Sequence, residues 1–362
     1  FQYLSLITSN NGYGGYTFGD SMDLISTGSY AYRLTNPDLT WETQEQLNFG
    51  IDARFLNNRL GFEFDWYNKN TRDWLVTAPV LSSFGANAVS VNGGNVKNTG
   101  IEVGLHWNDN IGKDFQYGAN LTLAHNKNEV TKIANKDGII HGSGSVLWEG
   151  AEECFRAEVG KPIGYFYGYK VEGVYQTQEE IEHSPKNTLA TVTPGDLKFA
   201  DVNGDGKITP DDRTKIGDPT PDVTYGISLG LSYKNWELSM EMMGQGGNQI
   251  YRTWDNYNWA QFNYMEQRLD RWHGEGTSNT QPLLNTKHAI NSENSEYFIE
   301  DGSFFRIRNL QLAYSFDKTL LSKIRMQALK VYVNIQNLKT WKHNTGYTPE
   351  IGGSAIAFGV DN

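Results

Sequence analysis

The sequence predicts an all-β chain that forms part of an antiparallel transmembrane β-barrel with long extracellular loops. Eight segments alternate apolar and polar residues, short turns join them in pairs, and much longer connections separate the pairs. Alternate residues of a membrane strand face lipid and lumen, and bacterial barrels have short periplasmic turns and long outer loops. The 20 Tyr, 10 Trp and 38 Gly also favour strands and turns over helices.

The eight segments form four hairpins in which the apolar residues of each segment share one face. The segments are 47–55 with 60–67, 101–107 with 116–123, 225–231 with 236–242, and 310–316 with 331–336. The first three pairs are joined by the predicted turns at Asn57 and Asn58, at 108–114 and at 233–235. The polar face carries carboxylates that a water-filled lumen accommodates, namely Glu63, Asp65, Glu102, Glu237 and Glu241. Arg306 and Arg308 break the alternation, so they should lie above the hydrocarbon or past a bulge.

Aromatic residues on the apolar face gather beside the predicted turns, where a barrel has its interfacial girdle. They are Phe55, Trp107, Tyr117, Tyr233, Trp236 and Phe316. A soluble β-sandwich or propeller also alternates, but it explains neither this girdle nor the unequal connections. No apolar run is long enough for a membrane helix, but this test does not detect the strands of a barrel.

The connections between hairpins are far longer than ordinary loops, at about 30 residues for 68–97, about 90 for 132–221 and about 50 for 252–302. We therefore expect two long extracellular regions, residues 134–221 and 251–302. The whole of 1–362 is expected to be the C-terminal portion of a barrel. The chain opens on Phe1 without a signal peptide and stops in mid-pattern, so we expect it to be a fragment.

Residues 201–212 (DVNGDGKITPDD) match the pattern of a calcium-binding loop. The expected ligands are the side chains of Asp201, Asn203 and Asp205, the carbonyl of Lys207 and the carboxylate of Asp212. Gly206 permits the sharp turn, and Ile208 should point inward. The flanks are not helical, so the sequence predicts a structural calcium site in a long loop; the alternative is an empty turn rich in Asp and Asn.

An aromatic run in the second long region suits stacking on sugar rings, with nearby amides and acids to bond hydroxyls. Its candidate substrate-binding residues are Trp254, Tyr257, Trp259, Tyr264 and Trp272. The alternative is that these rings form the small core that a loop of this length needs.

Several other functions have no residues to support them. The net charge of −11 argues against nucleic acid, the single Cys154 is expected to be an inert thiol, and no zinc or catalytic motif is present. Acidic pairs such as Glu152 with Glu153 are expected to be solvated loop charges. The sequence predicts no enzyme and no catalytic residue.

Several stretches, taken in order, resemble the C-terminal barrel of the SusC/RagA family of TonB-dependent outer-membrane transporters of Bacteroidetes. They are 36–43 (NPDLTWET), 64–73 (FDWYNKNTRD), 98–103 (NTGIEV), 194–206 (PGDLKFADVNGDG), 216–221 (IGDPTP), 300–310 (EDGSFFRIRNL) and 331–338 (VYVNIQNL). Each motif is short, but their order and their placement at strand ends make the combination specific.

The resemblance implies a 22-stranded barrel with an N-terminal plug, a SusD-like surface lipoprotein as partner, and energy from the TonB–ExbB–ExbD complex. The plug and the last strand are absent from these residues. It also implies uptake of oligosaccharides, or alternatively of peptides, across the outer membrane. A calcium-stabilised secreted glycan-binding protein is the alternative from another class.

Overall fold

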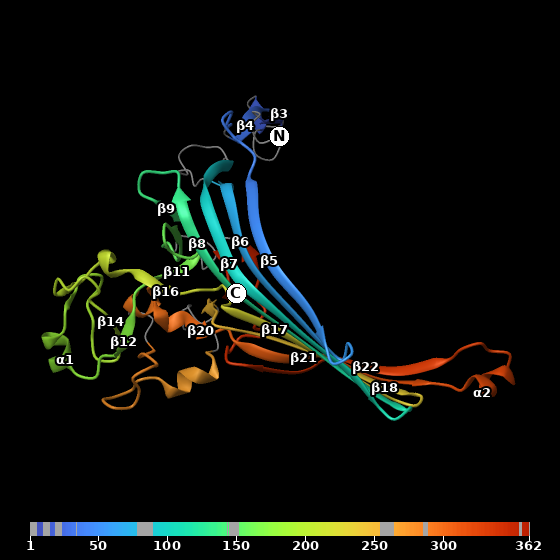
Figure 1. The fold of residues 1–362 in the computed structure, drawn as a ribbon. Helices are drawn as coiled ribbons and strands as arrows, with labels where there is room; N and C mark the ends of the chain where they lie inside the picture. The colour runs from blue at the N-terminus through green and yellow to red at the C-terminus, as the bar shows by residue number, and fades with distance from the viewer. Residues whose placement is uncertain are drawn as a thin grey trace.

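One antiparallel sheet of eight strands dominates the structure (Figure 1). The computed structural model describes residues 6–9, 15–18, 24–33, 35–77, 90–142, 144, 152–253, 264–284, 289–354 and 357–361. The strand order is β5-β6-β7-β8-β17-β18-β21-β22, which follows the order of the chain, with the two long connections inserted between β8 and β17 and between β18 and β21. The bounds are β5 Thr43–Phe55, β6 Leu60–Thr77, β7 Ser90–Ile111, β8 Phe115–Ile133, β17 Val223–Tyr233, β18 Trp236–Gly246, β21 Phe304–Ser315 and β22 Lys330–Lys342.

These eight strands are the eight predicted from the alternation, and their register keeps the two faces distinct. One row across the sheet, which lies on the apolar face, runs Ile51, Phe64, Val103, Leu123 and Tyr225. Side chains of this face are open in the isolated chain, with Phe49 61% and Val333 65% exposed. A wide apolar face with nothing packed on it is what lipid covers in a membrane barrel.

The turns gather at one end of the sheet and the long connections at the other (Figure 1). Leu56, Asn57 and Asn58 all have positive φ, which confirms the predicted tight turn between β5 and β6. The turn predicted at 108–114 is shorter than expected, because β7 continues to Ile111. The β21–β22 connection contains a short helix that the sequence did not predict, α2 at Lys318–Ser322.

The predicted connection at 68–97 is wrong in extent, because β6 and β7 remain paired as far as Thr77 and Ser90. Outside the hydrocarbon a strand no longer needs apolar residues on alternate positions, so the ladder continues where the sequence pattern stops. The register shifts near Trp74, opposite Gly94. Gly94 has a φ of +157°, and a Cβ there would lie 1.9 Å from the carbonyl oxygen of Lys132.

The predicted irregularity at Arg306 and Arg308 is a β-bulge. The pairing of β21 with β22 shifts register between Ile307 and Asn309, and the pairing with β18 shifts opposite Glu241 and Met242. A bulge inserts one residue and so restores the alternation on its far side. The bulge therefore accounts for the break in parity.

The long connections fold into a compact unit at the end of the sheet away from the turns, here termed the loop cap and defined as the described residues of 134–221 and 248–302 (Figure 1). Its strands are β9 Ile139–His141, β10 Phe155–Glu158, β11 Tyr165–Gly168, β12 Val171–Val174, β13 Lys186–Asn187, β14 Leu197–Phe199, β15 Lys207–Ile208, β16 Thr214–Gly217, β19 Gln249–Arg252 and β20 Ile299–Asp301. Its helices are α1 Gln178–His183 and the 3-10 turns Pro210–Asp212, Glu266–Asp270, Ala289–Ser292 and Glu296–Phe298.

Three buried apolar clusters hold this region together. The first centres on Phe155, Phe166, Tyr251 and Phe298, and joins both long connections. The second joins the cap to the upper ends of β6, β7 and β8 through Val76, Val96, Val130 and Ile140. The third is built on Tyr169, Leu197, Phe199, Ile208 and Ile290. The side-chain core of the described chain therefore lies in the loops and at the adjoining ends of β6, β7 and β8.

Short strands complete the description. They are β1 Leu6–Ser9, β2 Gly15–Phe18, β3 Leu24–Thr27, β4 Ser29–Arg33, β23 Gly353–Ser354, β24 Ala357–Phe358 and β25 Val360–Asp361. No helix in the described ranges has the length and apolarity needed to cross a membrane. Within those ranges, β5 and β22 are the edges of the large sheet.

Candidate functional site

The inner face of the sheet carries a continuous chain of polar contacts across four strands. Arg54 of β5 lies 3.3 Å from Glu63 of β6, whose other oxygen lies 3.0 Å from Nε2 of His106 on β7. Nδ1 of His106 is 2.9 Å from Oδ1 of Asn120 on β8. These residues share the face opposite the apolar row, as the alternation predicts.

Nearer the loop cap the inner face becomes rich in amides. The hydroxyl of Tyr67 donates to Asn126, and the amide groups of Asn126 and Asn128 both donate to Oδ1 of Asn98. Asn128 in turn accepts the backbone N–H of Ile163, at 2.8 Å, from the loop cap. One ladder of hydrogen bonds thus links the barrel wall to the folded loops, and its amides suit hydroxyl-bearing or peptide ligands.

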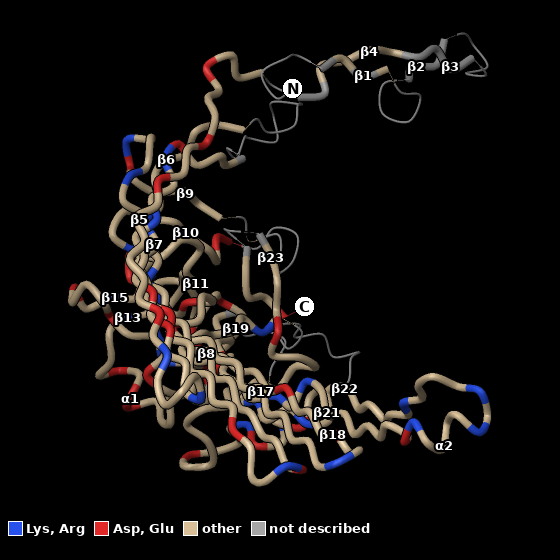
Figure 2. The backbone as a smooth tube through the Cα atoms, turned by 45° about the vertical axis from the view of Figure 1, so that its right-hand side comes forward, with Lys and Arg blue, Asp and Glu red and all other residues tan. Residues whose placement is uncertain are grey.

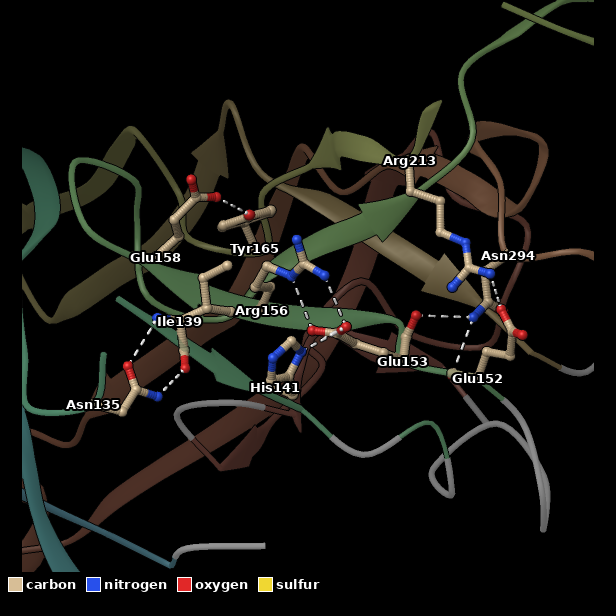
Figure 3. Close-up of polar contacts among 10 residues, drawn as sticks. All are labelled: Asn135, Ile139, His141, Glu152, Glu153, Arg156, Glu158, Tyr165, Arg213 and Asn294. Atoms are coloured by element: carbon tan, nitrogen blue, oxygen red, sulfur yellow. Dashed lines mark hydrogen bonds and ion pairs between the residues drawn. The ribbon is translucent and has the colours of Figure 1, made fainter. Parts of the chain in front are cut away.

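Charged groups inside the loop cap are paired rather than solvated (Figure 3). The carboxylate of Glu153 accepts two hydrogen bonds from Arg156, at 3.0 and 2.9 Å, and lies 2.9 Å from Nδ1 of His141. The guanidinium of Arg156 also lies over the ring of Tyr167. The expectation that Glu152 and Glu153 are solvated charges is wrong for Glu153, because strands β9 and β10 bring two partners, His141 and Arg156, to its carboxylate.

Glu152 remains exposed but forms an ion pair with Arg213, which also donates a hydrogen bond to the hydroxyl of Tyr169. Close by, burial raises the pKa of Glu293, and the nearby charge of Glu152 raises it further. Burial also raises the pKa of Tyr165, whose hydroxyl donates to Glu158 at 2.8 Å. This part of the cap is therefore a built polar network (Figure 3).

A second buried charge pair was missed from the sequence. Arg252 is 4% exposed, and it binds Glu300 at 3.0 Å and the carbonyl oxygen of Tyr297 at 3.3 Å. Glu300 also accepts the backbone N–H of Thr345. The partners lie 48 and 45 residues apart, so no local pattern could have revealed the pair.

The calcium-type loop is fully described, and its side chains are turned toward its own backbone. Asp201 accepts N–H groups from Gly204, Asp205 and Gly206, and Asn203 accepts that of Asp205. Gly204 and Gly206 have φ values of +75° and +82°. Ile208 is buried in the third cluster, as predicted.

Asp212, at the end of this loop, is fully buried. Its carboxylate accepts the backbone N–H groups of Val202, Asn203 and Thr209. In the described part of the chain, no three side chains of His, Cys, Asp or Glu gather as a metal site. Oδ2 of Asp201 and the Oδ1 atoms of Asn203 and Asp205 each accept one N–H and retain a lone pair, so these oxygens fit calcium chemically; each oxygen of Asp212 already accepts two donors.

The aromatic candidates divide into two groups. Trp254, Tyr257 and Trp259 lie outside the described residues. Tyr264 is half-buried just before the turn at Glu266–Asp270. Trp272 packs against the third cluster, and its Nε1 donates to Gln176 at 3.2 Å. For Trp272 the contacts are those of loop packing.

Comparison with known proteins places these features in context. The family model described as TonB dependent receptor-like, beta-barrel matches residues 5–338. The chain is 31% identical over 327 residues to TonB-dependent receptor P3 of Formosa agariphila, which covers 88% of this chain and 31% of that protein. It is 27% identical over 356 residues to TonB-dependent receptor SusC of Bacteroides thetaiotaomicron, which covers 97% of this chain and 33% of that protein.

Among solved structures, that of the RagAB peptide transporter matches with a TM-score of 0.77 at 24% identity, over 100% of this chain and 36% of that one. This likeness shows a shared fold. The chain spans about a third of the length of the curated relatives that it matches.

Proposed function

Since the chain belongs to the TonB-dependent receptor-like β-barrel family, whose members are outer-membrane transport proteins and not enzymes, we propose that it forms part of an active importer of oligosaccharides. One observation carries the proposal: a single sheet has an apolar open face, a polar inner face and a folded cap at the loop end. A wall of this kind separates lipid from an aqueous path.

The oligosaccharide assignment is supported by the amide ladder of Asn98, Asn126 and Asn128 and by the acids of the inner wall. Amide groups both donate hydrogen bonds to sugar hydroxyls and accept them, and carboxylates accept them. Peptide uptake is the second candidate, because a protein of the same fold is described as a peptide transporter. Backbone amides of a peptide suit the same ladder.

Uptake by whole cells separates the two candidates. Cells that carry or lack the gene are given fluorescent oligosaccharides and, separately, fluorescent peptides of similar size. We expect gene-dependent accumulation of the oligosaccharides, abolished by removal of TonB. Gene-dependent accumulation of peptides alone would refute the sugar assignment while leaving import intact, and accumulation of neither pool would count against import.

We propose two partners for the whole protein, a SusD-like surface lipoprotein at the loop end and the TonB–ExbB–ExbD complex at the turn end. The relationship to SusC supports both. Affinity purification of the tagged whole protein from outer membranes should recover one lipoprotein in equimolar amount. Recovery of the barrel protein alone under gentle detergent would contradict the first partner.

We also propose that the loop 201–212 binds calcium through Asp201, Asn203, Asp205, the carbonyl of Lys207 and Asp212. Calcium would supply a structural cross-link between the two ends of the loop. Chelation, or Asp201→Ala, should then raise protease sensitivity of the 134–221 region without preventing barrel insertion. Equal cleavage of the wild type with and without calcium would exclude the ion.

A further inference from the structure

The connection between β21 and β22, residues 317–329 and here termed the α2 hairpin, is an ordered unit rather than a simple turn. The N–H of Phe316 donates to the carbonyl of Leu329 and closes its base. Within it Leu321 is only 1% exposed, and its carbonyl accepts the N–H of Met326. The hairpin therefore holds its outward side chains in a defined arrangement.

Beside a few neutral polar residues, those outward side chains include three aliphatic and three basic ones, and the one acid, Asp317, stands at the base of the hairpin, where it accepts a hydrogen bond from Asn235. Leu320, Ile324 and Met326 are 53%, 60% and 41% exposed. Lys318, Lys323 and Arg325 stand between them, also exposed, and among the described residues none of the three forms an ion pair. No Asp or Glu occurs from 318 to 330, although the whole chain has a net charge of −11.

The position of the hairpin joins this surface to the membrane boundary. It lies at the turn end of the sheet, the periplasmic end of a barrel, and Lys and Arg mark its tip (Figure 2). The rings of Trp236, Tyr314 and Phe316 form a contact series at its base, with centroid separations of 4.8 and 5.0 Å. Trp236 and Phe316 are two of the residues predicted to form the interfacial girdle, so the apolar residues of the hairpin would continue that lipid-facing surface.

We propose that the α2 hairpin binds anionic phospholipid headgroups of the periplasmic leaflet. Basic residues beside exposed aliphatic residues are the composition of segments that lie in a membrane interface. An acidic protein would pair with the three cations, but it would not account for the exposed aliphatic residues that adjoin the girdle. Charge complementarity and continuity with the girdle therefore both favour lipid.

The test uses the whole transporter, purified in detergent and placed in bilayer discs of phosphatidylglycerol mixed with phosphatidylethanolamine. Native mass spectrometry measures which lipid stays bound. The variant K318Q/K323Q/R325Q should lose about 100-fold of its preference for phosphatidylglycerol, since each of the three cations near an anionic surface contributes about fivefold. The matched control K136Q/K170Q/K186Q, which removes three exposed cations from the loop end, should retain the wild-type preference.

Leu320→Ser/Ile324→Ser should also weaken the retention of phosphatidylglycerol. A shift in gel migration between heated and unheated samples confirms that each variant forms a barrel. Unchanged phosphatidylglycerol retention in the triple variant would overturn the proposal. If the triple variant also loses cross-links to a periplasmic protein while its lipid retention is unchanged, the hairpin binds that protein instead of lipid.

Discussion

Replacement of Asp212 by Ala should open the loop 201–212 whether or not calcium is present. The carboxylate is fully buried and accepts three backbone N–H groups, at 2.9 Å from Val202, 3.3 Å from Asn203 and 2.8 Å from Thr209. It also completes a capping box with Thr209. Removal of this side chain leaves these donors without their acceptor.

A hydrogen bond to a charged acceptor contributes about 1.5–3 kcal/mol, but two of the donors belong to exposed residues and can regain water. We therefore count about 1 kcal/mol for each donor, which gives about 3 kcal/mol for local opening. At about 1.4 kcal/mol per factor of ten, the open population rises about 100-fold.

Trypsin provides the assay, since Lys207 and Arg213 flank the affected turn. When opening is fast, the rate of cleavage follows the open population. We expect about 100-fold faster cleavage of D212A in the presence of EGTA, and no change for D211A, whose neighbouring carboxylate is exposed. Equal rates for the two variants would refute the assignment of Asp212 as the internal closure of the loop.

Three further predictions concern the loop cap. Burial, and secondly the charge of Glu152, raise the pKa of Glu293, so folding favours its protonated form. The stability that this protonated form contributes is present at low pH and is lost as the pH rises through the raised pKa. E293Q should therefore make the cap more resistant to proteolysis than the wild type at pH 7 but not at pH 3, and equal resistance of the two proteins at pH 7 would contradict the prediction. Burial raises the pKa of the Cys154 thiol, so the folded protein should resist maleimide labelling at pH 8 until denatured, whereas rapid labelling of the native protein would disprove the burial. Gly195 has a φ of +98°, and a Cβ there would lie 2.6 Å from the ring of Trp272. G195A should therefore lower the midpoint temperature of cap unfolding, measured by tryptophan fluorescence. The control G230A, at a position where a Cβ would meet no atom, should leave that midpoint unchanged.

The wall could be predicted from sequence because its signal is local. Each strand can be recognised from alternation over a few residues, as in 225–231 and 236–242, because every second side chain of a membrane strand faces lipid and is apolar. The ends of the strands could not be placed in the same way. Toward the loop cap the ladder of β6 and β7 continues without alternation, since 68–73 is polar at every position and 74–76 is apolar at every position, so the pattern ends before the pairing does.

The loop cap could not be predicted from sequence, because its contacts join residues that lie far apart in the chain. Its first cluster joins Phe155 to Phe298, and its buried ion pair joins Arg252 to Glu300. Such contacts depend on how the chain returns on itself, and no short window contains both partners. The sequence did identify the loop 201–212 and the inward Ile208, because all of that information lies within twelve consecutive positions.

The division between a wall of sequential hairpins and a cap of distant contacts also sets an order of events. Five of the seven strand pairs in the large sheet join strands that follow each other directly in the chain, and only β8–β17 and β18–β21 span a long connection; in the cap, by contrast, Asn294 donates to the carbonyls of Glu152 and Glu153 across 142 and 141 residues. Closure of so long a loop is entropically slow, and contacts of this kind delay folding. We expect refolding into detergent to proceed in two kinetic phases, with sheet formation by circular dichroism preceding burial of Trp272. A single common rate for both signals would show that wall and cap fold as one unit.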